Sequence, residues 1–154
     1  QECELSIRIG TALKNATAEQ AVAAINGVTL GLDLTLRDVQ NTLKSKGQPW
    51  ERAKSFDGAC VLGEWLAPDM LADFANATFR LSINGEPRQS GHTADMLFDV
   101  VQLLVDISHS FTLEAGDVVM TGTPAGVGPL HSGDQVVMTL DTILGAVSWG
   151  THVL

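Results

Sequence analysis

The sequence predicts an α+β domain built from many short strands and three helices. Segments that alternate apolar and polar residues recur along the chain, and several are bounded by Gly-Asp or Asn-Gly turns. The three helical segments do not regularly separate the strands, which excludes a doubly wound parallel fold. The chain has 154 residues, 45% of them hydrophobic, so residues 1–154 can form one domain with its own core.

A strand is expected at the start of the chain, followed by a helix. Residues 3–9 alternate apolar and polar side chains, which is typical of a strand with one buried face and one face toward solvent. Gly10 ends this strand. Thr17 to Gln20 has the form of a capping box, which predicts a short helix to Ile25, closed by Gly27.

The next segments predict a second strand and a second helix. Residues 28–34 form the strand candidate, and Thr35 is expected to cap a helix that runs to about Lys46. Gly47 ends that helix. Residues 49–68 show no clear period and are expected to be a loop.

The second half of the chain contains the clearest local signal. Asn84-Gly85 within residues 79–89 predicts a hairpin with a type I′ turn, because both residues tolerate positive φ. A helix is expected from Thr93 or Asp95 to about His109, with one apolar face. Three further strands are predicted at residues 118–121, 135–141 and 145–153.

Composition excludes several classes of function. The formal net charge is −9 and no basic cluster occurs, which argues against a nucleic-acid partner, since phosphates require Lys and Arg. The longest apolar stretch, residues 96–107, is interrupted by three polar residues and is too short to span a membrane.

The two cysteines, Cys3 and Cys60, do not form a CxxC pair, so a zinc site of that kind is not expected. The simplest interpretation is two buried thiols in a reducing cytoplasm, with a single disulfide as the alternative. No secretory signal is visible. The chain opens with Gln1 rather than Met and enters a strand at once, so an upstream segment is expected.

Three carboxylates are candidates for a metal site. Glu2 and Glu4 are two residues apart on a predicted strand, so both leave the same face, and Asp33 ends another strand. An all-oxygen, anionic site suits Mg²⁺, Mn²⁺ or Ca²⁺ and suits zinc or copper poorly. Spacing alone favours the simpler interpretation, in which Glu2 and Glu4 belong to a solvent-facing side of an edge strand.

Two cationic side chains and one amide are candidates for substrate contacts. Arg37 and Gln40 are three apart and share a helix face at a helix N-terminus, where an anion is favoured. An ordinary solvated face is the commoner case for such a pair, and Lys54 carries no local sign of burial. Residues 121–128 form a Gly-rich turn that is neither a Walker loop nor GxGxxG, and its N–H groups and hydroxyls could line an oxyanion pocket.

The four histidines are scattered, and none pairs with another at metal-ligand spacing. A G-x-S-x-G nucleophile elbow is absent, so Ser-His-Asp chemistry has no starting point.

Five groups of residues follow one another along the chain. They are Glu2 to Leu5, Gly31 to Gln40, Lys46 to Trp50 with Ala53 to Phe56, Asn84 to Gln89, and Leu113 to Asp117 with Thr121 to Gly128. In the same order they resemble the E-x-E-L metal strand, the D-x-T-x-R-D-x-Q segment, the KG-x-PW…AKSF loop, the NGE-x-RQ hairpin and the L-x-x-GD…TGTP-x-GVG motif of the fumarylacetoacetate hydrolase family. The shared order and spacing make the resemblance specific.

The resemblance implies a mixed β-sheet roll with a few short helices, usually a homodimer. It implies that Glu2, Glu4 and Asp33 hold Mg²⁺, with Mn²⁺ or Ca²⁺ as alternatives. The remaining implied site residues act on substrate, with Lys54 adding positive charge at a developing enolate and Thr123 donating to a carboxylate. Arg37 and Gln40 would orient the acyl side.

The intact KG-x-PW…AKSF loop resembles the acylpyruvase or fumarylpyruvate hydrolase branch. That branch implies hydrolysis of a carbon–carbon bond in a small 2,4-dioxo acid through a metal-stabilised enolate. The same site chemistry also fits oxaloacetate decarboxylation or isomerisation of a 2-hydroxy-dienoate.

The chain departs from the family in one respect. The family's general base is a His paired with a Glu on an N-terminal lid, upstream of the E-x-E strand, and none of the four histidines matches that position. A catalytically silent, metal-binding dimerisation module with the same fold is therefore a third alternative.

Overall fold

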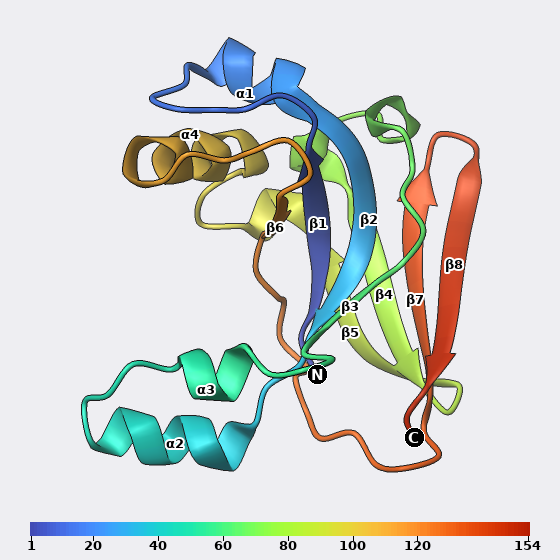
Figure 1. Ribbon diagram of the computed structural model, residues 1–154. Coiled ribbons are helices and arrows are strands. Elements are labelled where there is room, and N and C mark those ends of the chain that lie inside the picture. The colour runs from blue at the N-terminus through green and yellow to red at the C-terminus, as the bar shows by residue number, and fades with distance from the viewer.

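The computed structural model describes residues 1–154 and contains two four-stranded antiparallel sheets. The first has the strand order β3-β2-β1-β6 and the second β5-β4-β7-β8, with β1 and β2 lying across the second sheet in Figure 1. The strands are β1 (Cys3–Ile9), β2 (Ile25–Asp33), β3 (Cys60–Leu62), β4 (Thr78–Ile83), β5 (Glu86–His92), β6 (Val118–Met120), β7 (Gln135–Thr142) and β8 (Gly145–His152).

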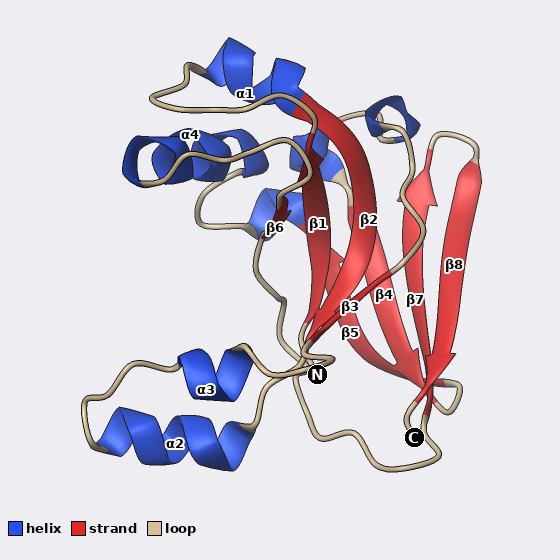
Figure 2. Ribbon diagram, in the orientation of Figure 1, coloured by secondary structure: helices blue, strands red, loops and turns tan.

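The α-helices all lie to one side of the sheets, as Figure 2 shows. They are α1 (Ala18–Ala24), α2 (Arg37–Ser45), α3 (Glu51–Lys54) and α4 (Val100–Ser110), and short 3-10 helices occupy Pro68–Met70, Phe74–Asn76 and Thr93–Asp95. No helix has the length and apolarity needed to cross a membrane. The predicted α+β roll, dominated by strands with few helices, is confirmed, although all six strand pairings are antiparallel where the resemblance implied a mixed sheet.

The main core lies between the two sheets. Alternate residues of β1, β2, β4 and β7 point into it, among them the fully buried Leu5, Leu30, Leu81 and Leu140. Burial of these side chains is the largest favourable contribution to the stability of the fold.

The opposite face of β1 is also covered, and this corrects the prediction of a half-buried strand. Glu4 is 5% exposed and Ser6 is completely buried. β1 lies between β2 and β6 instead of at a sheet edge, and the side chains of Leu62 and Met120 lie close to Ser6 Oγ around Gly31. Glu4 and Ser6 therefore lie inside the protein, whereas Arg8, further along β1, is partly exposed.

Helix boundaries agree with the capping signals in part. The capping box of Thr17 and Gln20 is present, but β2 begins at Ile25, so Gly27 lies inside a strand. The cap predicted at Thr35 is wrong: the residue before α2 is Leu36, whose N–H donates to Ala53 O at 3.0 Å, and Thr35 Oγ1 has no partner.

The helix predicted from Thr93 or Asp95 begins later, at Val100. Thr93–Asp95 forms a separate 3-10 turn, and Asp99 supplies the capping box for α4 together with Gln102. The apolar pattern therefore predicts that a helix is present, whereas the capping box of Asp99 determines where it starts.

Residues 49–68 are not a plain loop. They contain α3 and β3, and β3 pairs with β2 so that Cys60 lies opposite Asp33. Both cysteines are free; Cys3 is buried as expected, but Cys60 is exposed.

The hairpin prediction is confirmed. Asn84 and Gly85 have φ values of 54° and 82°, as a type I′ turn requires, and they join β4 to β5.

Candidate metal and substrate site

Antiparallel pairing of β1 with β2 brings the three predicted carboxylates together. The start of β1 lies against the end of β2, and Asp33 N donates to Glu2 O at 2.9 Å. One carboxylate oxygen from each of Glu2, Glu4 and Asp33 lies within 4.8 Å of the other two. Glu2 directly precedes β1 and Glu4 lies within it, and their spacing of two residues lets both carboxylates reach the same place.

Lys54, from α3, contacts two of these carboxylates. Its Nζ donates to Glu2 Oε2 at 2.7 Å and to Asp33 Oδ2 at 2.6 Å. Burial lowers the pKa of Lys54, but the hydrogen bonds to Asp33 and Glu2 outweigh that effect, and the pKa is raised above its usual value of 10.5. The ammonium group is therefore charged at neutral pH and neutralises part of the acidic cluster.

Arg37 contacts the cluster from the first residue of α2. Its Nη2 donates to Glu2 Oε1 at 2.9 Å, and its Nη1 donates to the buried Gln40 Oε1 at 3.1 Å. Gln40 thus holds the guanidinium group, and the predicted Arg37–Gln40 pair on one helix face is present. The Arg37 side chain is 51% exposed, which leaves N–H groups facing outward for an anionic ligand.

Glu4 is the most buried of the three carboxylates. Burial is the main reason that its pKa is raised to about 6, and the nearby Asp33 and Glu2 carboxylates raise it further. Gly122 N donates to Glu4 Oε2 at 2.7 Å, which opposes the shift. Gly122 has a φ of 103°, a conformation that favours glycine. The Gly-rich run therefore does supply an N–H to an anion, but the anion is Glu4.

Thr123 lies beside the cluster in a different role from the one implied by the resemblance. Its Oγ1 donates to Cys3 O at 2.8 Å and accepts from Gln89 Nε2 at 2.8 Å. Because the hydroxyl proton is used by the backbone of β1, Thr123 holds the strand in place in this conformation and does not offer a free donor to a substrate carboxylate.

The donor set fits a hard divalent cation. Mg²⁺, Mn²⁺ and Ca²⁺ prefer carboxylate oxygens at about 2.0–2.6 Å, so oxygens up to about 4–5 Å apart can share one ion. The oxygens of Glu2, Glu4 and Asp33 satisfy this separation. Their three negative charges face the two positive charges of Arg37 and Lys54, which leaves the cluster with a net attraction for a cation.

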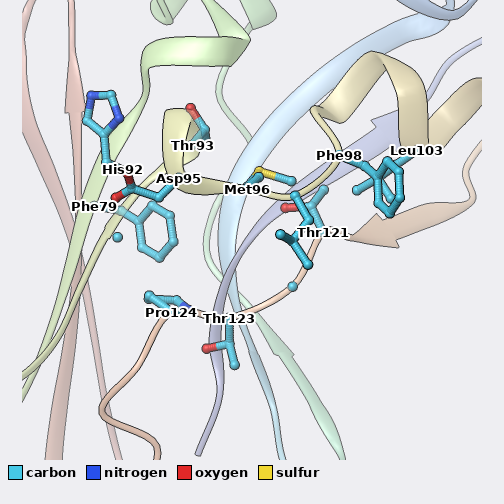
Figure 3. A pocket seen from close by; sticks show the side chains of 13 residues that line it. Phe79, His92, Thr93, Asp95, Met96, Phe98, Leu103, Thr121, Thr123 and Pro124 are labelled. Carbon is cyan, nitrogen blue, oxygen red and sulfur yellow. The ribbon is translucent and has the colours of Figure 1, made fainter.

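A cavity of about 330 Å³ lies next to this cluster but is not lined by any of its carboxylates. Phe79 and Met96 form part of its apolar wall, and His92 and Asp95 lie to one side of it in Figure 3. It shares only the segment 121–124 with the carboxylate site. The carboxylate cluster is therefore the better candidate for chemistry, since it brings charged groups together.

None of the four histidines makes a hydrogen bond or ion pair with the cluster. His92 Nδ1 accepts from Ala94 N at 3.2 Å, and His131 contacts Asp134 through its backbone. His109 lies in the last turn of α4, and His152 is the last residue of β8.

The raised pKa of Glu4 predicts an unusual pH dependence for the metal-free protein. The folded protein keeps a proton on Glu4 that the unfolded chain loses above its usual pKa of 4.5. The stabilising contribution is therefore present at pH 4.5 and is lost as the pH rises to about 6, by about 1–2 kcal/mol. Urea unfolding with EDTA at both pH values measures this loss. Glu4→Gln keeps an acceptor for Gly122 N but cannot titrate, so equal pH slopes in both proteins would contradict the assignment.

Comparison with known proteins reveals close relatives. Residues 1–148 match the family model described as fumarylacetoacetate (FAA) hydrolase C-terminal. The chain is 52% identical over 141 residues to an oxaloacetate tautomerase of Escherichia coli (strain K12), covering 91% of this chain and 64% of that protein. It is 38% identical over 144 residues to a mitochondrial oxaloacetate decarboxylase of Dictyostelium discoideum, covering 92% and 66%. The chain thus spans about two thirds or less of these relatives' lengths.

A solved structure of a family member has the same fold as this chain. Fumarylpyruvate hydrolase from Pseudomonas aeruginosa, in complex with Mn²⁺ and pyruvate, superposes with a TM-score of 0.89 at 32% identity. The match covers 99% of this chain and 65% of that one. The family model, these relatives and the shared fold show that the chain belongs to the fumarylacetoacetate hydrolase family.

Proposed function

We propose that this protein interconverts the keto and enol forms of a 2-oxo acid, with oxaloacetate as the first candidate substrate. The observation that carries this proposal is the position of Lys54, whose ammonium group lies within 2.7 Å of two carboxylates of the cluster. A fixed positive charge at that place would stabilise negative charge on an enolate oxygen. The E. coli relative, 52% identical, is an oxaloacetate tautomerase, which supports this choice of reaction.

Each residue has a distinct part in the proposal. Glu2, Glu4 and Asp33 would hold Mg²⁺ or Mn²⁺, and the chemistry supplied by such an ion is Lewis-acid polarisation of the 2-oxo group. Arg37, held by Gln40, would bind a substrate carboxylate through its outward N–H groups. The reaction requires proton transfer at carbon but no attacking water.

The second candidate is hydrolysis of a carbon–carbon bond in a 2,4-dioxo acid of the fumarylpyruvate type. The fumarylpyruvate hydrolase structure, which has pyruvate and Mn²⁺ bound, favours it. This reaction needs a general base to activate water. The homodimer implied by the resemblance remains a prediction, and sedimentation equilibrium of the full chain would test it.

Three assays on the full chain with Mg²⁺ separate the candidates. Loss of the ultraviolet absorbance of enol-oxaloacetate reports tautomerisation, pyruvate release from oxaloacetate reports decarboxylation, and cleavage of acetylpyruvate reports hydrolysis. We expect accelerated loss of the enol without pyruvate. Pyruvate formation or acetylpyruvate cleavage as the faster reaction would reject tautomerisation as the main activity, and inactivity in all three assays with intact metal binding would favour a silent module.

A further inference from the structure

Gln89 connects the second sheet to the carboxylate strand of the first. It lies on β5 and is only 3% exposed. Its Oε1 accepts from Cys3 N at 3.0 Å, and its Nε2 donates to Thr123 Oγ1 at 2.8 Å and to Pro124 O at 3.0 Å. Both N–H groups of the amide are used inside the protein, so Gln89 is not available to a ligand.

Together with one further bond, these hydrogen bonds form a closed ring around Cys3, the residue between Glu2 and Glu4. Thr123 Oγ1, which accepts from Gln89, donates in turn to Cys3 O at 2.8 Å. Both backbone polar groups of Cys3 are therefore held by side chains that are also bonded to each other. Because Cys3 lies between Glu2 and Glu4, the ring fixes the peptide units from which both carboxylates project.

The hydrogen bonds of this ring take the place of backbone pairing that β6 does not provide at Cys3. β6 pairs with β1 only as far as Met120 opposite Ser6, and Thr121 continues with bonds to Leu5 O. Cys3 is completely buried beyond that point, where an unpaired backbone N–H would cost about 1–3 kcal/mol. Gln89 supplies the missing acceptor from another sheet.

The Gln89 amide also affects Glu4 indirectly, through the segment that follows β6. Gln89 holds Thr123 and Pro124, and the adjacent Gly122 donates its N–H to Glu4 Oε2 at 2.7 Å. Loss of the amide would therefore loosen both the strand that carries Glu4 and the segment that orients its carboxylate.

We infer that Gln89 is a positioning residue that sets the separation of Glu2 and Glu4 by tying β1 to residues 121–124. The inference rests on the proposed cation site for its consequence in binding. A carboxylate could not replace the amide, because Glu at position 89 could accept from Cys3 N but could not donate to Pro124 O.

The test compares Mn²⁺ affinity of the full chain with Gln89→Met, which keeps the size of the side chain, and Gln89→Glu, which keeps one acceptor. We expect the dissociation constant measured by calorimetric titration to rise about 10–100-fold in both. Ser108→Ala is the matched control: Ser108 is 1% exposed, accepts from Ala16 N at 2.9 Å and donates to Val105 O at 2.7 Å, on α4. It should lower Tm without changing Mn²⁺ affinity.

Amide hydrogen exchange of the metal-free protein provides a readout that needs no ion. We expect faster exchange in residues 2–5 and 121–123 of Gln89→Met, and no change there in Ser108→Ala. Unchanged exchange in both segments, or an affinity loss no larger than that of Ser108→Ala at equal Tm, would overturn the role of Gln89. If the unmodified protein binds no Mn²⁺, the proposed cation site fails, whereas the exchange result still decides whether Gln89 holds the carboxylate strand.

Discussion

Asp33→Ala is expected to weaken Mn²⁺ and Mg²⁺ binding by at least about 100-fold, because it removes one of the three carboxylates of the proposed cation site and not merely an outer contact. The protein should remain folded, since Asp33 is a partly exposed residue at the end of β2 and Lys54 keeps its bond to Glu2. Calorimetric titration of the purified variant measures the affinity, and Tm of the metal-free form checks the fold.

Asp57→Ala is the matched control for charge. Asp57 is exposed and makes no side-chain hydrogen bond, so its loss changes the net charge by the same amount as the loss of Asp33 without touching the cluster. Affinity should fall only for Asp33→Ala. Equal affinity in the two variants would reject the three-carboxylate site.

Lys54→Met is expected to have the opposite effect on binding and a large effect on activity. Its ammonium group neutralises Glu2 and Asp33, so its removal should leave a more anionic cluster that binds Mn²⁺ at least as tightly as before. The turnover number should nevertheless fall about 10²–10³-fold, the usual loss when one stabilising donor at a developing oxyanion is removed.

The combination of unchanged or tighter Mn²⁺ binding with slower turnover distinguishes a chemical role of Lys54 from a structural one. Titration with Mn²⁺ and steady-state kinetics on the best substrate measure the two quantities on the same sample. Lys46→Met, which removes an exposed lysine near the end of α2, should change neither. Weaker ion binding in Lys54→Met would mean that Lys54 holds the site together and does not act on substrate.

The hairpin and the capping box of α1 could be predicted because their determinants are local. Asn84-Gly85 adopts the positive φ values that its sequence favours, and Thr17 with Gln20 forms the expected cap. The core strands also follow from their alternation, since apolar residues of β1 and β7 point into one cluster.

The covered face of β1 could not be derived in the same way. Alternation along β1 gives the side to which Glu4 and Ser6 point, but it does not reveal whether another strand lies on each edge. Burial of these residues depends on the pairing of β1 with β2 and with β6, and β6 lies more than a hundred residues further along the chain. The short strand β3 cannot be predicted for a related reason, because it is defined by its pairing with β2 rather than by its own sequence.

Among the site residues, too, contacts between near neighbours in the sequence can be predicted, and contacts between distant segments cannot. Arg37 and Gln40 are neighbours on a helix turn, so their hydrogen bond follows from spacing. Lys54 carries no local sign of its contact with Glu2 and Asp33, and only the family resemblance indicates that it belongs to the site. Gln89 stood within a recognised motif, but its bond to Cys3 spans 86 positions and joins two sheets.

The distance along the chain between Glu4 and Gly122, 118 positions, has a consequence for how the protein is made. A contact of that separation carries a large loop-closure entropy, and folds rich in such contacts form slowly. β1, which carries Glu4, is synthesised before β6, so its second edge stays unpaired until β6 and the segment after it have been made. An ion that needs Glu4 held by Gly122 would therefore bind only after these two distant segments have come together, and it could not nucleate the fold.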